Sequence, residues 1–114
     1  MSDDKLRMLI KRLLVKTIAG EVRWSETPSQ EAFQASFPSY SVEVECAGGA
    51  TYFRVYNSEG RVLDWTSDKV IEHEDKENFD ESDDAEKLIE LYGLARRQAL
   101  GVERALDELL ATLT

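Results

Sequence analysis

The sequence predicts a two-layer α+β domain, and three patterns lead to that prediction. An amphipathic helix is indicated near the N-terminus, short alternating strands in the middle, and a long heptad repeat at the C-terminus. The 114 residues suit one domain, and an apolar content of 42% is sufficient for a core without cross-links. We therefore expect a single domain over residues 1–114, with both helices on one face of an antiparallel sheet.

The N-terminal helix is predicted over residues 3–18. Apolar positions recur there at helical spacing, in the order Leu6, Ile10, Leu13 and Thr17. Asp3 and Asp4 suit the positive end of the helix dipole, and Gly20 marks the end of the helix. Its flanks are basic, which also fits a helix lying on a membrane surface. We favour packing on the protein core, with the long cationic side chains reaching solvent.

Residues 21–66 predict an antiparallel meander of four or five strands. Val22 and Trp24 are expected to begin the first strand, and a second strand is expected near 32–37. The dipeptide Gly48-Gly49 predicts a two-residue hairpin turn, because both central residues of that turn need positive φ. With this turn, Val44 faces Phe53, and one face of the hairpin is consistently apolar.

A second hairpin turn is predicted at Asn57-Ser58-Glu59-Gly60. In the register that this turn implies, Val55 faces Leu63 and Phe53 faces Trp65. Trp65 would then lie on the apolar inner face. The outer face would carry a charge ladder made of Glu43, Arg54 and Asp64.

The outer face of the predicted sheet is a candidate partner-binding surface. Its members are Tyr52, Arg54, Tyr56 and Val62. Tyrosine and arginine are enriched among residues that dominate binding energies. Ordinary cross-strand pairing on a solvated face explains the same residues and remains the alternative.

Acidic residues are concentrated between the sheet and the C-terminal repeat. The whole chain has net charge −9, and residues 64–90 carry twelve acidic against three basic side chains. We interpret residues 67–82 as an acidic loop with one short helix near 67–72, and we expect Val70, Ile71 and Phe79 to be its apolar anchors. This balance disfavours binding to phosphate backbones and favours a basic protein as partner; a solvated loop that aids solubility is the alternative.

The C-terminal segment, residues 83–113, predicts one long helix. Its apolar positions follow one another at alternating spacings of four and three, and we call them the heptad stripe: Leu88, Tyr92, Ala95, Ala99, Val102, Leu106, Leu109 and Leu113. Because the spacing continues without interruption past Gly101, we expect the helix to continue through that glycine. Glycine in a helix interior costs about 1 kcal/mol, which packing can offset.

The length of this helix predicts self-association. A helix of about 30 residues spans about 45 Å, whereas a strand of about eight residues spans about 27 Å. The leucine-rich end therefore extends past the sheet and needs the N-terminal helix, a second subunit or another protein to cover it; we favour the first two together. We therefore expect a homodimer.

The remaining motifs point to no catalytic, cofactor or metal site. The segment around Leu100-Gly101-Val102 resembles the turn of a helix-turn-helix motif. However, Arg97 occupies the position where that motif has a small residue, and Asp107 occupies a position that is apolar in the motif. The run HEDKENFDESDDAE lacks the glycine and alternation of a calcium loop. His73 is the single histidine and is expected on the surface; the single Cys46 is expected to be buried and inert.

A reducing, cytoplasmic setting is expected. With one cysteine, no internal disulfide can form. No stretch approaches the roughly 20 apolar residues of a membrane span, and the N-terminus lacks the apolar core of a signal peptide. We therefore expect no membrane insertion.

Both ends of the chain carry a recognisable pattern. The motif GEVRW follows the first helix, and LYGLARRQALGVERALDELLATL closes the sequence. Together they resemble a family of small bacterial proteins of uncharacterised activity. The resemblance implies a bacterial, cytoplasmic protein and implies no catalytic residue.

Three functions fit these observations. The first is a non-catalytic interaction or regulatory protein that dimerises through the C-terminal helix. The second is an acidic inhibitor of a basic protein, of the immunity-protein or antitoxin kind. The third is a small-ligand-binding domain with a pocket between sheet and helices, which would require convergent polar groups in that pocket.

Overall fold

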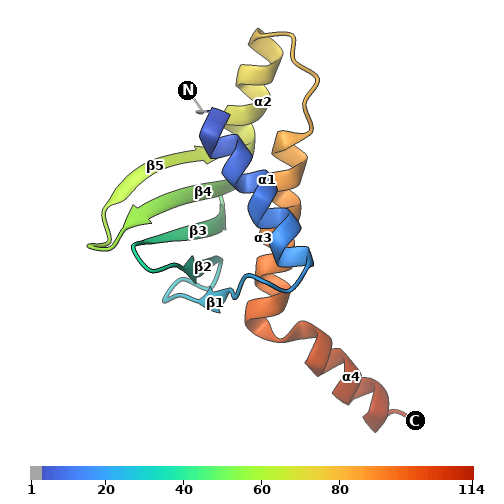
Figure 1. Cartoon of the computed structure of the whole chain (residues 1–114). Coiled ribbons are helices and arrows are strands. Elements are labelled where there is room, and N and C mark those ends of the chain that lie inside the picture. Colours follow the sequence, from blue (N-terminus) through green and yellow to red (C-terminus); the bar gives the residue numbers. More distant parts are fainter. Residues whose placement is uncertain (1–3) are drawn as a thin grey trace.

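The computed structural model describes residues 4–114, so the predicted helix start at Asp3 lies outside the described residues. Helix α1 (Asp4–Ile18) precedes five strands, and three helices follow them (Figure 1). The strands are β1 (Ser25–Glu26), β2 (Ala32–Ser36), β3 (Tyr40–Ala47), β4 (Ala50–Asn57) and β5 (Val62–Ser67); the helices are α2 (Asp68–Glu77), α3 (Asp84–Leu100) and α4 (Val102–Thr112). The strands form one antiparallel sheet in sequence order. The predicted α+β fold is confirmed.

One hydrophobic core lies between the sheet and the helices. The sheet contributes Phe33, Val44 and Phe53, while Ile10 of α1 and Leu88 of α3 meet them from the helical layer. Alternation along the strands places these apolar side chains on one face, so α1 and α3 cover that face side by side (Figure 1).

The β3–β4 hairpin has the predicted register. Val44 lies opposite Phe53, and Gly48 and Gly49 have φ of 57° and 79°. Only glycine adopts two such conformations in succession at low cost, so the dipeptide determines the turn and the turn determines the pairing.

The predicted β4–β5 register is wrong by one residue over most of its length. Tyr56 pairs with Val62 as the turn requires, but a β-bulge follows, and Arg54 then lies opposite Trp65. Because side chains alternate with period two, this shift moves Trp65 to the outer face, where it is 50% exposed. Thr66 takes the inner position opposite Phe53 and is fully buried.

The start of α2 explains the bulge. Ser67 is the N-cap of α2, and its side chain accepts a hydrogen bond from the Val70 N–H at 3.1 Å. The next residue, Asp68, accepts one from the backbone N–H of Thr51 in β4 at 2.8 Å. These contacts fix the end of β5 against β4, and the bulge absorbs the residue left over between this anchor and the turn.

The acidic segment 67–82 is more helical than predicted, because the short helix expected near 67–72 extends to Glu77. A ten-residue helix, α2, occupies most of it. Ile71 of α2 is fully buried in the core, and Asp75 faces α1. The sequence of α2 is too polar to indicate a buried face by its hydropathy, because part of that face consists of carboxylates that pair with a cation far away in the chain.

The predicted continuous helix over 83–113 is also wrong. Gly101 adopts φ 65° and ψ 37°, which ends α3 at Leu100, and α4 starts at Val102. Glycine meets no steric penalty in this left-handed conformation. The helix axis therefore changes direction at this one residue, while the apolar positions on both sides keep their alternating spacings of four and three. For that reason the spacing in the sequence did not reveal the break. Helix α4 projects away from the body of the protein (Figure 1).

Val22 and Trp24 do not begin a strand as predicted. Both are buried in the connection between α1 and β1. The side chain of Gln98 in α3 holds this connection, since it accepts from the Trp24 N–H at 2.8 Å and donates to the Val22 carbonyl at 2.9 Å. The Trp24 indole donates to the Thr17 hydroxyl at 3.0 Å. The connection thus ties α1 to α3.

Candidate functional site

Helix α4 presents an apolar surface to solvent. None of its residues is buried. We define the α4 leucine face by its four leucines, which are 44 to 81% exposed: Leu106, Leu109, Leu110 and Leu113. At 100° per residue these side chains share one side of the helix. Leu110 was not among the predicted interface residues, although its position four residues after Leu106 is itself a helical signal.

The other half of the heptad stripe lies inside the protein. Leu88 and Ala95 are fully buried beneath the sheet. Tyr92 is half-buried, packs on Phe33 at a ring-centroid distance of 5.9 Å, and donates to Glu31 at 2.9 Å. Burial and this hydrogen bond raise the pKa of Tyr92 to about 12. Ala99, near the end of α3, and Val102, the first residue of α4, are also half-buried.

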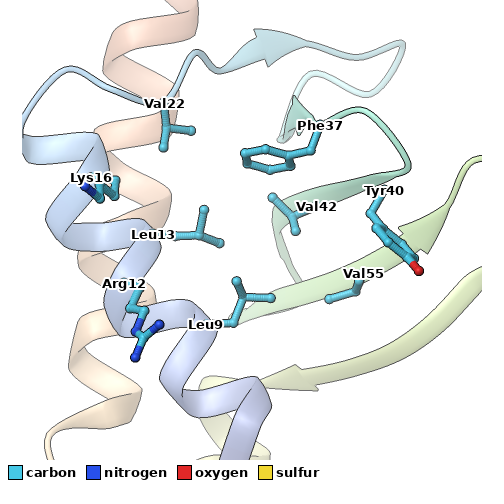
Figure 2. A pocket seen from close by; sticks show the side chains of 9 residues that line it. All are labelled: Leu9, Arg12, Leu13, Lys16, Val22, Phe37, Tyr40, Val42 and Val55. Atoms are coloured by element: carbon cyan, nitrogen blue, oxygen red, sulfur yellow. The ribbon is translucent and has the colours of Figure 1, made fainter.

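A groove of about 430 Å³ lies between α1 and the sheet (Figure 2). Helix α1 contributes Leu9, Arg12, Leu13 and Lys16 to its lining. The opposite side comes from Val22, Phe37, Tyr40, Val42 and Val55. We call this feature the α1 groove. The sequence did not reveal it, because its two walls lie far apart in the chain.

The chemistry of the α1 groove is apolar with a cationic edge. Arg12 and Lys16 are one helical turn apart on α1, and both are exposed. Lys16 forms an ion pair with Glu21 at 2.9 Å. No hydrogen bond or ion pair involves Arg12 within residues 4–114. The groove lacks the set of convergent polar groups that fixes the orientation of a polar metabolite, so it suits an apolar occupant with negative charge at one side.

The predicted partner face on the outer side of the sheet is held together by its own contacts. Arg54 donates to Glu43 at 2.9 Å and to Glu45 at 2.8 Å, and it stacks over the Tyr52 ring at 5.2 Å. Tyr56 donates to Glu43 at 2.9 Å. These contacts fit the cross-strand alternative, because the charges on this face already have partners.

The bulge adds apolar surface to this face that was not predicted. Trp65 packs against Tyr52 with ring centroids 6.1 Å apart, and Val62 and Leu63 on the edge strand β5 are about half exposed. The exposed apolar surface around Val62 is therefore larger than the sequence predicted, because Leu63 and Trp65 add to it. The pKa of Tyr56 is raised, mainly by burial and secondly by its hydrogen bond to Glu43.

Part of the acidic segment forms an internal ion-pair cluster with Arg7 of α1. Arg7 contacts Asp75 at 2.6 Å, Asp84 at 3.1 Å and Glu74 at 3.1 Å. Desolvation pulls the pKa of Asp75 upward, but hydrogen bonds from Ser82 and Arg7 and the charge of Arg7 outweigh it and hold that pKa below its ordinary value. These carboxylates stabilise the fold and are not free to attract a partner.

The remaining acidic residues surround an exposed aromatic ring. Phe79 lies directly after α2 with φ 52° and is 94% exposed. A positive φ is unfavourable for a bulky residue. The phenyl ring also contributes no hydrophobic free energy to folding while it is exposed to solvent. The exposed acids on either side are Glu77, Asp80, Glu81 and Asp83. The sequence predicted Phe79 to be an apolar anchor of this segment, and that prediction is wrong, whereas the anchor predicted at Ile71 is fully buried.

The single histidine and the single cysteine are both at ordinary structural positions. His73 is exposed on α2 and lies 3.1 Å from Glu77. Cys46 on β3 is only half-buried, so its predicted full burial is wrong. Across the described residues, no group of three His, Cys, Asp or Glu side chains is arranged to hold a metal ion. No described helix combines the length and the apolarity needed to cross a membrane.

Comparison of the chain with protein-family models, with curated proteins and with solved structures found no match. The resemblance to a family of small bacterial proteins therefore stays a prediction. What the chain does must be inferred from its own surfaces, of which the α4 leucine face and the α1 groove are the most apolar.

Proposed function

We propose that the protein is a non-catalytic interaction protein that self-associates through α4. The observation that supports this most directly is the α4 leucine face, which lies on a helix that points away from the core. Isolated exposed leucines are common on protein surfaces, but four on one side of a short helix form a contiguous apolar patch. A helix of 11 residues with few tertiary contacts is also marginal in water, so a partner would stabilise α4 itself.

The break at Gly101 changes the predicted mode of dimerisation. A continuous helix would have offered one straight heptad surface, as in a coiled coil. Instead α3 uses its half of the heptad stripe for the protein's own core, and α4 has the other half available. We propose a homodimer in the bacterial cytoplasm, where the half-exposed Cys46 would stay reduced.

The proposed dimer is tested by measuring molecular mass in solution. Light scattering at micromolar concentration is expected to give about twice the 13.0 kDa of the chain. Leu109→Glu should give a monomer, because it places a charge in the centre of the leucine face. Ile89→Glu is the matched control, since Ile89 is a comparably exposed aliphatic residue on α3. A wild-type mass of one chain would reject self-association.

A second candidate function, inhibition of a basic protein, is favoured by Phe79. An exposed phenyl ring in an unfavourable backbone conformation, among acidic side chains, matches a contact that inserts into an apolar socket with a basic rim. The acids available for this are the four exposed ones around Phe79; Asp75 and Asp84 belong to the Arg7 cluster. Association with such a partner would be fast and salt-sensitive.

This second function is tested with two variants of the same loop. Replacing Glu77, Asp80, Glu81 and Asp83 by their amides should slow association with a basic partner isolated from the native host. Phe79→Ser should speed dissociation and leave the association rate nearly unchanged. Unchanged rates in both variants would reject the inhibitor function and leave the proposed dimer untouched.

A further inference from the structure

We propose that the α1 groove of one subunit receives α4 of a second copy of the same chain, and that the exchange is reciprocal. This inference rests on the proposed self-association and specifies its contact surface. It joins two features of the structure that expose apolar surface: an apolar groove and an apolar helix face.

The two surfaces match in apolar character. The lining of the groove consists of aliphatic and aromatic groups, apart from the two cationic side chains at its edge. Phe37 and Tyr40 are about half exposed there, so the groove also presents apolar area that a docked helix would cover (Figure 2). The leucine face is the complementary partner, since one side of a short helix inserts its side chains into such a groove.

The charges beside the two surfaces are also complementary. On α4, Glu103 and Asp107 are one turn apart, on the same flank of the leucine face. On α1, Arg12 and Lys16 are one turn apart at the edge of the groove. Within residues 4–114, the side chains of Arg12 and Asp107 take part in no hydrogen bond or ion pair, whereas Glu103 is paired with Arg97 and Lys16 with Glu21. An acidic pair of helical spacing thus has a basic pair of the same spacing to meet.

The direction of α4 favours a second copy over the chain's own groove. Gly101 sends α4 away from the body, while the groove lies between α1 and the sheet (Figures 1 and 2). A reciprocal exchange about a two-fold axis uses each contact twice and closes the assembly as a dimer. Contact between two α4 helices alone would bury the leucines and leave both grooves open.

Cross-linking between two single-cysteine variants tests the contact directly. Both variants are made in a Cys46→Ser background; one carries Tyr40→Cys in the groove and the other Leu110→Cys on α4. A short thiol-specific cross-linker applied to the mixture should give a covalent dimer that contains one chain of each variant. Each variant alone should give little. A matched control replaces Tyr40→Cys by Glu72→Cys, which is exposed on α2, away from the groove lining, and should not cross-link.

Charge exchange provides a second measurement that is independent of cross-linking. Arg12→Glu and Asp107→Arg should each weaken the dimer, by about tenfold in Kd, because each acts at two symmetric contacts. The double variant should return to within about twofold of the wild type. Arg23→Glu is the control, since it makes the same charge change outside the groove and should leave Kd unchanged.

The outcomes separate this inference from the proposed function. A wild-type dimer in which Leu110→Cys alone cross-links efficiently would mean that α4 packs on α4, which overturns the groove contact and retains self-association. A dimer whose Kd is unchanged by both charge variants would also overturn it. A wild-type protein that stays a monomer would overturn both. Cross-linking in the mixture together with rescue in the double variant would establish the exchange.

Discussion

The heptad stripe runs through two regions with opposite environments. In α3, Leu88 is fully buried, whereas in α4 Leu109 is 57% exposed, although the two occupy equivalent positions of the same 4-3 repeat, 21 residues apart. The difference arises from what lies beside each helix. The sheet and α1 cover α3, whereas the leucines of α4 stay exposed among the residues that the structure describes. A hydrophobic repeat therefore indicates which residues seek burial, and only the surroundings decide whether the chain itself supplies it.

The largest expected effect is the contrast between equivalent leucines in the two regions. Leu88→Ala should lower the free energy of unfolding by about 3 to 5 kcal/mol, because it opens a cavity in the core. Leu109→Ala should change it by less than about 0.5 kcal/mol when measured at concentrations too low for self-association. Chemical denaturation of both variants checks this. Equal losses would mean that α4 is covered within one chain.

The Arg7 cluster is expected to give the next largest effect and shows how the body differs from α4. Arg7→Met should lower the free energy of unfolding by about 2 to 3 kcal/mol at neutral pH, because it leaves buried carboxylates without their cation. By contrast, Arg104→Met removes an exposed ion pair with Glu108 on α4 and should change it by less than about 1 kcal/mol.

The pH dependence of the Arg7 effect has a defined sign. Because the folded-state pKa of Asp75 lies below its ordinary value of 3.8, the stabilisation is present above that pH and is lost as the pH falls through the folded-state pKa. The difference between wild type and Arg7→Met should therefore shrink as the pH is lowered below about 4. A constant difference down to pH 2 would contradict the assignment.

Substitution of Gly101 tests the boundary between the two regions. Gly101→Ala adds about 1 kcal/mol of strain to the left-handed conformation and favours a straight helix by about 1 kcal/mol. We expect α3 and α4 to become more nearly continuous, with a larger maximum dimension in small-angle X-ray scattering. Gly93→Ala is the control inside α3, where no atom within 4 Å obstructs the added methyl and φ is not positive. It should stabilise α3 without changing the shape.

The smallest effect is expected just after α2, where the residue that follows the C-cap Asn78 is left-handed, as Gly101 is after α3. There the residue is Phe79 rather than glycine. Phe79→Gly should raise the free energy of unfolding by about 0.5 to 1 kcal/mol by relieving strain. Phe79→Ala should leave it nearly unchanged, since it keeps the strain and removes a ring that contacts little. A loss of stability in Phe79→Gly would mean that the ring packs on the protein.

Local signals in the sequence predicted the elements that depend on neighbouring residues. Gly48-Gly49 predicted the β3–β4 register correctly, and Gly60 with Asn57 predicted the second turn, where the Asn57 N–H donates to the Arg61 carbonyl at 3.0 Å. The same kind of signal failed one residue past the turn. The bulge depends on the pairing of Asp68 with Thr51, which is 17 positions away.

For the candidate site, the sequence located the apolar residues but not their arrangement. Leu106, Leu109 and Leu113 were recognised from their spacing, and they are the residues that α4 exposes. The α1 groove was missed because Leu9 and Val55 come from opposite layers of the fold. Phe79 was wrongly predicted to be an anchor, because nothing in its local pattern distinguishes an exposed ring from a buried one.

The sequence by itself determined the identity of the elements: an amphipathic first helix, a meander whose turns are set by glycine, and a C-terminal stripe of apolar residues at helical spacing. These follow from the conformational preferences of short segments and from side-chain periodicity. Only the tertiary structure decided that α2 is a helix held by Arg7, that Trp65 faces outward, and that the stripe divides at Gly101 into a buried and an exposed half. Each of these depends on contacts between residues far apart in the chain, and a local pattern carries no information about which distant surface it will meet.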